Sequence, residues 1–237
     1  MINEQNNVYV LIHSPLVGGL TWALVADQMR QKSLDVVIPL LLDSSDSPEP
    51  FWKQHAESVS HALAHIPKDV AITLVAHSGA GALLPAIRQY LPNPANAYVF
   101  VDAGIPRDGA TRLDVMKLED PEWAEQFHEE LESGERFPNW SMEDLRDVIP
   151  DESLREQIVA EIRPRGLSFF AEPIPVFSGW PDAPCVYIRF SAPYDRPAAQ
   201  ARRAGWPTYE LEAGHFHMLV DPVNVMEMIV KAVNKLT

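Results

Sequence analysis

Residues 71–85, AITLVAHSGAGALLP, contain an apolar run that ends at a serine among small residues. Residues 71–76 have the length and composition of a buried strand, and helix-forming residues follow the serine. A strand that turns directly into a helix leaves little room at the turn. The residues two before and two after Ser78 must therefore be small, and they are Ala76 and Ala80. This stretch predicts a tight strand–turn–helix unit with Ser78 at the turn.

The composition favours a single α/β domain with room for an insertion, since the chain has 237 residues of which 46% are hydrophobic. The formal net charge of −14 opposes binding to nucleic acid or to an anionic membrane surface, so neither is expected as a partner. The single cysteine, Cys185, opens an apolar run and is expected to be buried; one cysteine cannot form an internal disulfide or a thiolate metal cluster.

The N-terminal residues MINEQNNVYV lack the features of a signal peptide. No stretch reaches the roughly 18 uncharged apolar residues that a membrane span requires. We therefore expect a cytoplasmic protein, either a monomer or a homodimer.

Strand-like runs alternate with helical patterns along most of the chain, which indicates a mostly parallel sheet with helices on both faces. A helix is expected from Thr21, which can cap it, to residue 31. The six expected strands are 8–12, 35–41, 71–78, 97–102, 185–190 and 208–212. The other expected helices are 51–65, a helix after Ser78 reaching residue 91, 196–204 and 222–235.

The alternation stops between residues 105 and 184, where three helical pieces are expected instead. Asp120 and Pro121 form a helix start, Ser141 with Asp144 resembles a capping box, and Asp151 can cap a third piece reaching residue 162. This segment holds eight basic and nineteen acidic residues, a net charge of −11, together with many large apolar side chains. We interpret it as a helical cap that is charged outside and apolar underneath.

Five segments carry a resemblance to a known family: VYVLIHSPLVGGLTW (8–22), LVAHSGAG (74–81), VFVDAG (99–104), SAPYD (191–195) and AGHFHMLVDP (213–222). In this order they resemble the α/β-hydrolase superfamily over essentially the whole chain, and within it the small capped serine esterases related to plant methyl esterases and hydroxynitrile lyases. The resemblance implies an α/β-hydrolase core formed by residues 1–104 and 185–237. A helical cap, residues 105–184, is inserted after the fourth strand.

The resemblance also implies a catalytic triad in the order serine, acid, histidine. A serine hydroxyl needs an imidazole to accept its proton, and the imidazole needs a carboxylate to orient it. Ser78 is the expected nucleophile. His215, directly after the last strand, is the expected base, with His217 as its competitor. Asp195, past the end of the fifth strand, is the expected acid, and Asp102, at the end of the fourth strand, is the alternative.

An oxyanion hole requires two hydrogen-bond donors, and Gly79 N–H is expected to supply one. The family usually takes the second from the residue after a His-Gly pair. Here the corresponding pair is His13-Ser14, and Pro15, which follows, has no N–H. The Leu16 N–H or the Ser14 hydroxyl is the expected substitute.

The reaction implied by the resemblance is acyl transfer from an ester, lactone or thioester of a small, hydrophobic substrate, with no cofactor and no metal. His13 and His77 are further candidates for supporting the triad, and the residues expected to line the substrate pocket are Trp123, Phe127, Trp140 and Phe216. His61 and His65 lie four residues apart, but no glutamate follows His61 as the zinc-protease motif requires.

Two alternatives remain open at this point. A lyase of the same fold is disfavoured because Phe216 follows His215 where hydroxynitrile lyases carry a lysine. A non-hydrolytic protein that binds a small ligand is kept open by Pro15, because loss of one oxyanion donor costs two to three orders of magnitude in rate.

Overall fold

The computed structural model describes residues 7–236, in which six parallel strands form one sheet in the order β2-β1-β3-β4-β5-β6. The predicted six-stranded sheet is confirmed, although β2 and β6 are shorter than expected. Residues 1–6, which belong to the stretch without signal-peptide features, lie outside the described residues. The strands are β1 (Asn7–Ile12), β2 (Asp35–Val37), β3 (Ala71–Ser78), β4 (Ala95–Ala103), β5 (Cys185–Arg189) and β6 (Thr208–Glu210).

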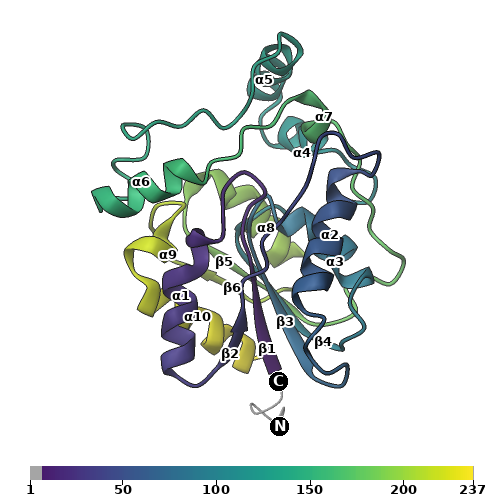
Figure 1. The fold of residues 1–237 in the computed structure, drawn as a ribbon, viewed down its shortest axis with the longest axis vertical. Helices are drawn as coiled ribbons and strands as arrows, with labels where there is room; N and C mark the ends of the chain where they lie inside the picture. The colour runs from purple at the N-terminus through teal and green to yellow at the C-terminus, as the bar shows by residue number, and fades with distance from the viewer. Residues whose placement is uncertain (1–6, 237) are drawn as a thin grey trace.

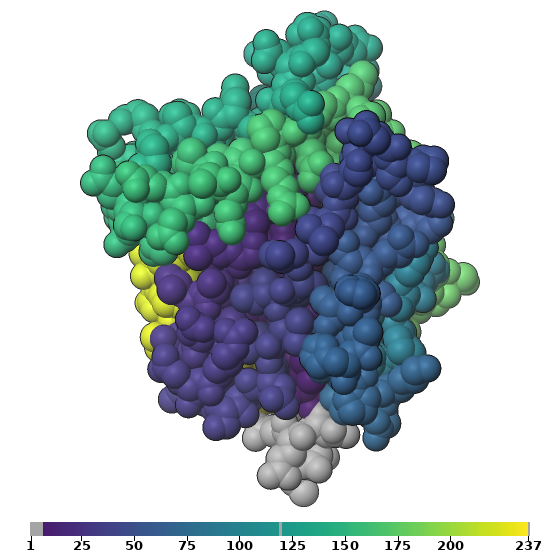
Figure 2. Space-filling model, in the orientation of Figure 1, coloured from purple at the N-terminus to yellow at the C-terminus, as the bar shows by residue number. Residues whose placement is uncertain are grey.

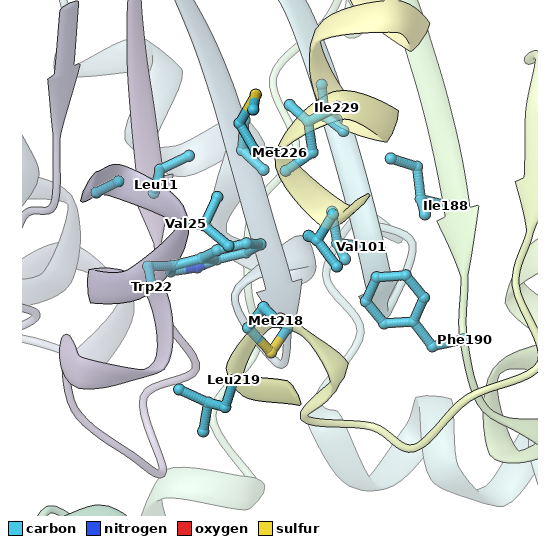
Figure 3. Packing of buried hydrophobic residues seen from close by; sticks show 14 of the residues in the cluster. Leu11, Trp22, Val25, Val101, Ile188, Phe190, Met218, Leu219, Met226 and Ile229 are labelled. Carbon is cyan, nitrogen blue, oxygen red and sulfur yellow. The ribbon is translucent and has the colours of Figure 1, made fainter. Parts of the chain in front are cut away.

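Helices cover both faces of the sheet (Figure 1). On one face lie α1 (Leu20–Gln31), α9 (His217–Val220) and α10 (Pro222–Asn234); on the other lie α2 (Phe51–Ala62), the short helical turn Gly81–Leu83 with α3 (Leu84–Gln89), and α8 (Asp195–Arg203). Successive strand residues point to opposite faces. Thus Leu11 packs with Trp22 and Met226 on the face covered by α1 and α10 (Figure 3). Val10 points to the opposite face, which α2, α3 and α8 cover.

Neither α1 nor α2 has a side-chain cap from its own N-cap residue, contrary to the expectation for Thr21. Thr21 lies inside α1 and its hydroxyl donates to the Gly18 carbonyl at 2.9 Å. A distant carboxylate caps α1 instead: Glu161 Oε2 accepts from Leu20 N–H at 3.0 Å. Glu172 does the same for α2, accepting from Phe51 and Trp52 N–H at 2.7 and 3.0 Å. Both glutamates come from the segment between β4 and β5, so this segment is tied to the core at two helix N-termini.

The segment between β4 and β5 lies over one end of the sheet, above β1 and α1 in Figures 1 and 2. Its helices are α4 (Arg112–Glu119), α5 (Pro121–Glu132), α6 (Glu152–Ala160) and α7 (Leu167–Phe170). The predicted N-caps Asp120 and Asp151 are confirmed at α5 and α6. The predicted Ser141–Asp144 box also forms its reciprocal hydrogen bonds, but it starts turns rather than a helix. Helix α4 was not predicted.

Cys185 is buried, as expected, and its burial raises the pKa of the thiol to about 12. None of the described helices has the length and apolar character needed to cross a membrane.

Candidate active site

Ser78 is the last residue of β3 and has a positive φ of 58°. This conformation is rare for a residue with a side chain and occurs where strain is part of a functional site. The turn closes tightly because Ala76 and Ala80 are fully buried, as the sequence predicts. Gly81 is also required here, since a methyl group on it would lie 2.1 Å from the Gly104 carbonyl oxygen. The helical turn after Ser78 therefore lies directly against the backbone that follows β4, and this close approach fixes the position of Ser78.

His215 follows β6 and its Nδ1 lies 2.9 Å from Asp102 Oδ2. A carboxylate oxygen accepts, so Nδ1 carries the proton and Nε2 keeps its lone pair. The same carboxylate accepts from Phe190 and Ser191 N–H at 2.7 and 3.0 Å and from the Ser191 hydroxyl at 2.5 Å. Asp102 is fully buried and, like Ser78, has a positive φ, of 43°. The chain thus holds one buried carboxylate firmly against the imidazole.

Asp195 does not reach His215, contrary to the expectation from the sequence. It is the first residue of α8, its side chain is 59% exposed, and it forms an ion pair with Arg189 at 2.5 Å. The physical reason is that the guanidinium of Arg189, at the end of β5, contacts Asp195 Oδ1 through both Nε and Nη2. The alternative that the sequence left open, Asp102, is the carboxylate that contacts the histidine.

Tyr194, which the sequence pattern does not single out, contacts both Ser78 and His215. Its hydroxyl lies 3.1 Å from Ser78 Oγ. Its ring stacks on the His215 imidazole, with centroids 5.0 Å apart and planes within 5°. Among the described residues, the hydrogen bond of Ser78 Oγ is made with Tyr194 rather than with His215. In the sequence, Tyr194 lies in the SAPYD loop, directly before Asp195, the expected acid.

The three other histidine candidates have distinct positions. His77 is fully buried, and its Nε2–H donates to the backbone carbonyl of His215 at 3.0 Å; burial, with the nearby His215, holds its pKa well below the usual value. His13 is also fully buried, and its burial lowers its pKa to about 4. His217 starts α9 and packs edge-on against the ring of Phe190. Of these three histidines, His77 supports the loop that presents His215, through its hydrogen bond to the His215 carbonyl.

Of the expected oxyanion donors, Gly79 N–H and the Ser14 hydroxyl lie next to each other, whereas Leu16 N–H is already used in a hydrogen bond. A methyl group on Gly79 would lie 3.6 Å from Ser14 Oγ, so the Gly79 backbone and the Ser14 hydroxyl are adjacent. Leu16 N–H is not free for this role because it donates to Ser14 Oγ at 3.3 Å. That bond uses a lone pair of the hydroxyl and leaves its proton without an acceptor among the described residues. The geometry therefore favours the Ser14 hydroxyl over the Leu16 N–H.

An open groove of about 520 Å³ lies beside His215. Its walls include Trp140 and Phe216, two of the four residues expected to line a substrate pocket, together with Leu145 and Val148. Trp123 and Phe127 do not line it. They stack on each other on α5, and Phe127 packs into an aromatic cluster with Phe137 and Phe170.

The comparisons with known proteins agree with this architecture. Residues 9–227 match a family described as Alpha/beta hydrolase family. No curated protein matches the chain.

Three solved structures resemble the chain over nearly its whole length. An extracellular α/β-hydrolase from a Paenibacillus species, described as sharing structural and functional homology with tobacco salicylic acid binding protein 2, is 19% identical with a TM-score of 0.74, covering 95% of this chain and 98% of its own. Tomato methylketone synthase I, in complex with 2-tridecanone, is 16% identical with a TM-score of 0.74, covering 98% and 99%. An Arabidopsis methylesterase is 15% identical with a TM-score of 0.68, covering 96% and 99%.

Proposed function

Because the chain belongs to the alpha/beta hydrolase family, we propose that it is a serine esterase that cleaves a small, hydrophobic ester, lactone or thioester through an acyl-enzyme. The observation that carries this proposal is the hydrogen bond between His215 Nδ1 and the buried Asp102 carboxylate, beside a strained serine. The pair leaves His215 Nε2 as a base, which is what a serine hydroxyl requires at neutral pH.

In the first step, Ser78 Oγ attacks the substrate carbonyl carbon while His215 Nε2 accepts the hydroxyl proton. Asp102 stabilises the imidazolium that forms and holds its orientation. The carbonyl oxygen becomes an oxyanion, which Gly79 N–H and the Ser14 hydroxyl bind as donors. The intermediate then collapses, and the leaving alcohol or thiol takes the proton from His215.

In the second step, water attacks the acyl-enzyme and gives its proton to the same imidazole. The carbonyl–Ser78 bond breaks, the serine regains its proton, and the acid product is released. Either hydroxyl can donate in the contact between Tyr194 and Ser78 Oγ. In this proposal Tyr194 is the donor, because that direction leaves the serine's own proton available to His215.

The groove beside His215 supports a substrate with a hydrophobic part, because four of its seven lining residues are aromatic or aliphatic. The other three are Asn139, Asp144 and His215. In this proposal residues 105–184 act as a cap that brings Trp140 and Val148 to the reacting groups.

The proposal is tested with p-nitrophenyl esters of acetate, hexanoate, decanoate and benzoate. We expect kcat/KM to rise from acetate to the longer or aromatic acyl groups in the wild-type protein and to vanish in Ser78→Ala. A strong preference for acetate would contradict the hydrophobic substrate. Absence of turnover with every ester would favour a ligand-binding protein.

A further inference from the structure

A second groove, of about 380 Å³, lies between α4 and α8. Three arginines line it: Arg107, in the loop after β4, and Arg196 and Arg203, on α8. Arg196 and Arg203 are seven residues apart, which places them on the same side of the helix two turns apart. In a chain with a net charge of −14, this concentration of positive charge is local and specific.

The guanidinium groups of Arg107 and Arg203 have neither an ion pair nor a hydrogen bond with the side chains that the structure describes. Arg196 makes a single hydrogen bond, from Nη1 to the Leu118 carbonyl at 2.8 Å, which holds it across the groove at the end of α4. Most of the donors of the three side chains are therefore available to a ligand.

The neighbouring acidic side chains form their hydrogen bonds and ion pairs with residues that do not line the groove. Asp195 pairs with Arg189, and Glu210 pairs with Arg202 on another side of α8. Asp114, on α4, accepts from the backbone N–H and hydroxyl of Thr111 at 2.9 and 2.8 Å. These hydrogen bonds lower the pKa of Asp114, and the nearby charges of Lys117 and Arg107 add to the lowering. No acidic side chain that the structure describes lines the groove.

The rest of the groove wall is mainly apolar. Val115 and Leu118 lie three residues apart on α4, and Ile105 faces them from the loop after β4. Leu118 is 57% exposed, so its side chain is accessible to a ligand in the groove. Arginines at one side of an apolar surface match a molecule with an anionic head and an apolar body.

We propose that this groove binds an amphipathic organic anion, with a carboxylate or phosphate head held by Arg107, Arg196 and Arg203 and an apolar chain on Val115 and Leu118. The groove borders the segments that hold the candidate active site: Ile105 comes three residues after Asp102, and Arg196 comes two residues after Tyr194. The site itself is independent of whether Ser78 acts as a nucleophile.

The test is an NMR titration of the ¹⁵N-labelled full chain with octanoate, octyl phosphate and, as a neutral control, octanol. We expect saturable shifts in α4 and α8 with either anion, weakened by added salt, and binding at least tenfold tighter than that of octanol. The tighter of the two anions identifies the head group.

Variants assign the effect to the groove. Arg107→Gln/Arg203→Gln should weaken binding of the anion at least tenfold. The matched control Arg30→Gln/Arg202→Gln removes the same amount of charge, and Arg202, like Arg203, lies on α8. Arg30 and Arg202 form surface ion pairs outside the groove, so this variant should bind the anion as the wild type does. Equal weakening in both variants, no weakening in the first, or equally tight binding of octanol would overturn the proposal. None of these readouts depends on turnover of an ester.

Discussion

His215 Nδ1 lies 2.9 Å from Asp102 Oδ2. Asp102 lies near the end of β4, the strand that pairs with β3, and β3 ends at the strained Ser78. This carboxylate accepts three further hydrogen bonds, from Phe190 N–H, Ser191 N–H and the Ser191 hydroxyl. It therefore fixes the tautomer of the imidazole without being free to rotate away.

Asp102→Asn should lower kcat by about four orders of magnitude, because an amide in place of the carboxylate favours the wrong tautomer of His215. Asp195→Asn is the matched control, and it should keep kcat within about threefold of wild type because Asp195 contacts Arg189 at the surface. Steady-state kinetics on both variants with one ester measures the contrast. The reverse order of the two losses would return the acid role to Asp195.

Ser14→Ala should lower kcat by about 10² to 10³ because it removes a donor to the oxyanion. Ser14→Thr keeps the hydroxyl and should recover most of the activity. An unchanged kcat in Ser14→Ala would show that Leu16 N–H, released from its bond to Ser14 Oγ, is the donor instead.

Tyr194→Phe should lower kcat by about twofold to tenfold with little change in KM, since it removes one hydrogen bond to Ser78 and retains the ring that stacks on His215. Tyr194→Ala removes both contacts and should cost more. The comparison of kcat and KM for the two variants separates the hydroxyl from the ring, and a faster Tyr194→Phe enzyme would mean that the hydroxyl restrains the serine.

Gly81→Ala should destabilise the fold by about 1–3 kcal/mol. Its methyl group would lie 2.1 Å from the Gly104 carbonyl oxygen and push the helical turn after Ser78 away from the end of β4. Gly79→Ala meets its nearest atom at 3.6 Å and should be nearly neutral for stability. Thermal unfolding followed by circular dichroism compares them; similar melting temperatures would contradict the tight turn.

The free energy of unfolding should fall as the pH falls from 6.5 towards 4. Burial lowers the pKa of His13 to about 4 and that of His77 well below its usual value of 6.5. Between pH 6.5 and 4, His13 and His77 bind protons in the unfolded chain but stay neutral in the native chain. The stabilisation is therefore fully present above pH 6.5, and for His13 alone it amounts to about 3 kcal/mol.

Urea unfolding between pH 7.5 and 4.5 measures this slope. His13→Asn should reduce it, and His61→Gln, at an exposed position on α2, should leave it unchanged. A free energy of unfolding that stays constant over the range would contradict the neutral, buried histidines.

The parts of the fold and site predicted from sequence are those set by local pattern. Ser78 is identified by the small residues around it, and His215 by its place after the last strand. The choice between Asp102 and Asp195 depends on which carboxylate contacts the imidazole. In the structure Asp102 does, whereas Asp195 pairs with Arg189. The role of Tyr194 is likewise not visible in the sequence, because its contact with Ser78 joins residues 116 positions apart in the chain.

The helix caps show the same limit. The sequence places Thr21 where a cap residue is expected, yet Glu161 caps α1 from 141 positions away. Glu172 caps α2 in the same way. It also pairs with Arg112 at 3.3 Å, and the Arg112 guanidinium lies over the face of the Phe169 ring. No local pattern reports a partner that arrives from an inserted segment.

Labelling with a fluorophosphonate probe tests most directly whether Ser78 is an activated nucleophile. We predict stoichiometric labelling of the wild-type protein, none of Ser78→Ala, and strongly slowed labelling of His215→Ala and Asp102→Asn. A folded wild-type protein that resists the probe, or that labels equally well without Ser78, would contradict the assignment of this chain as a serine hydrolase.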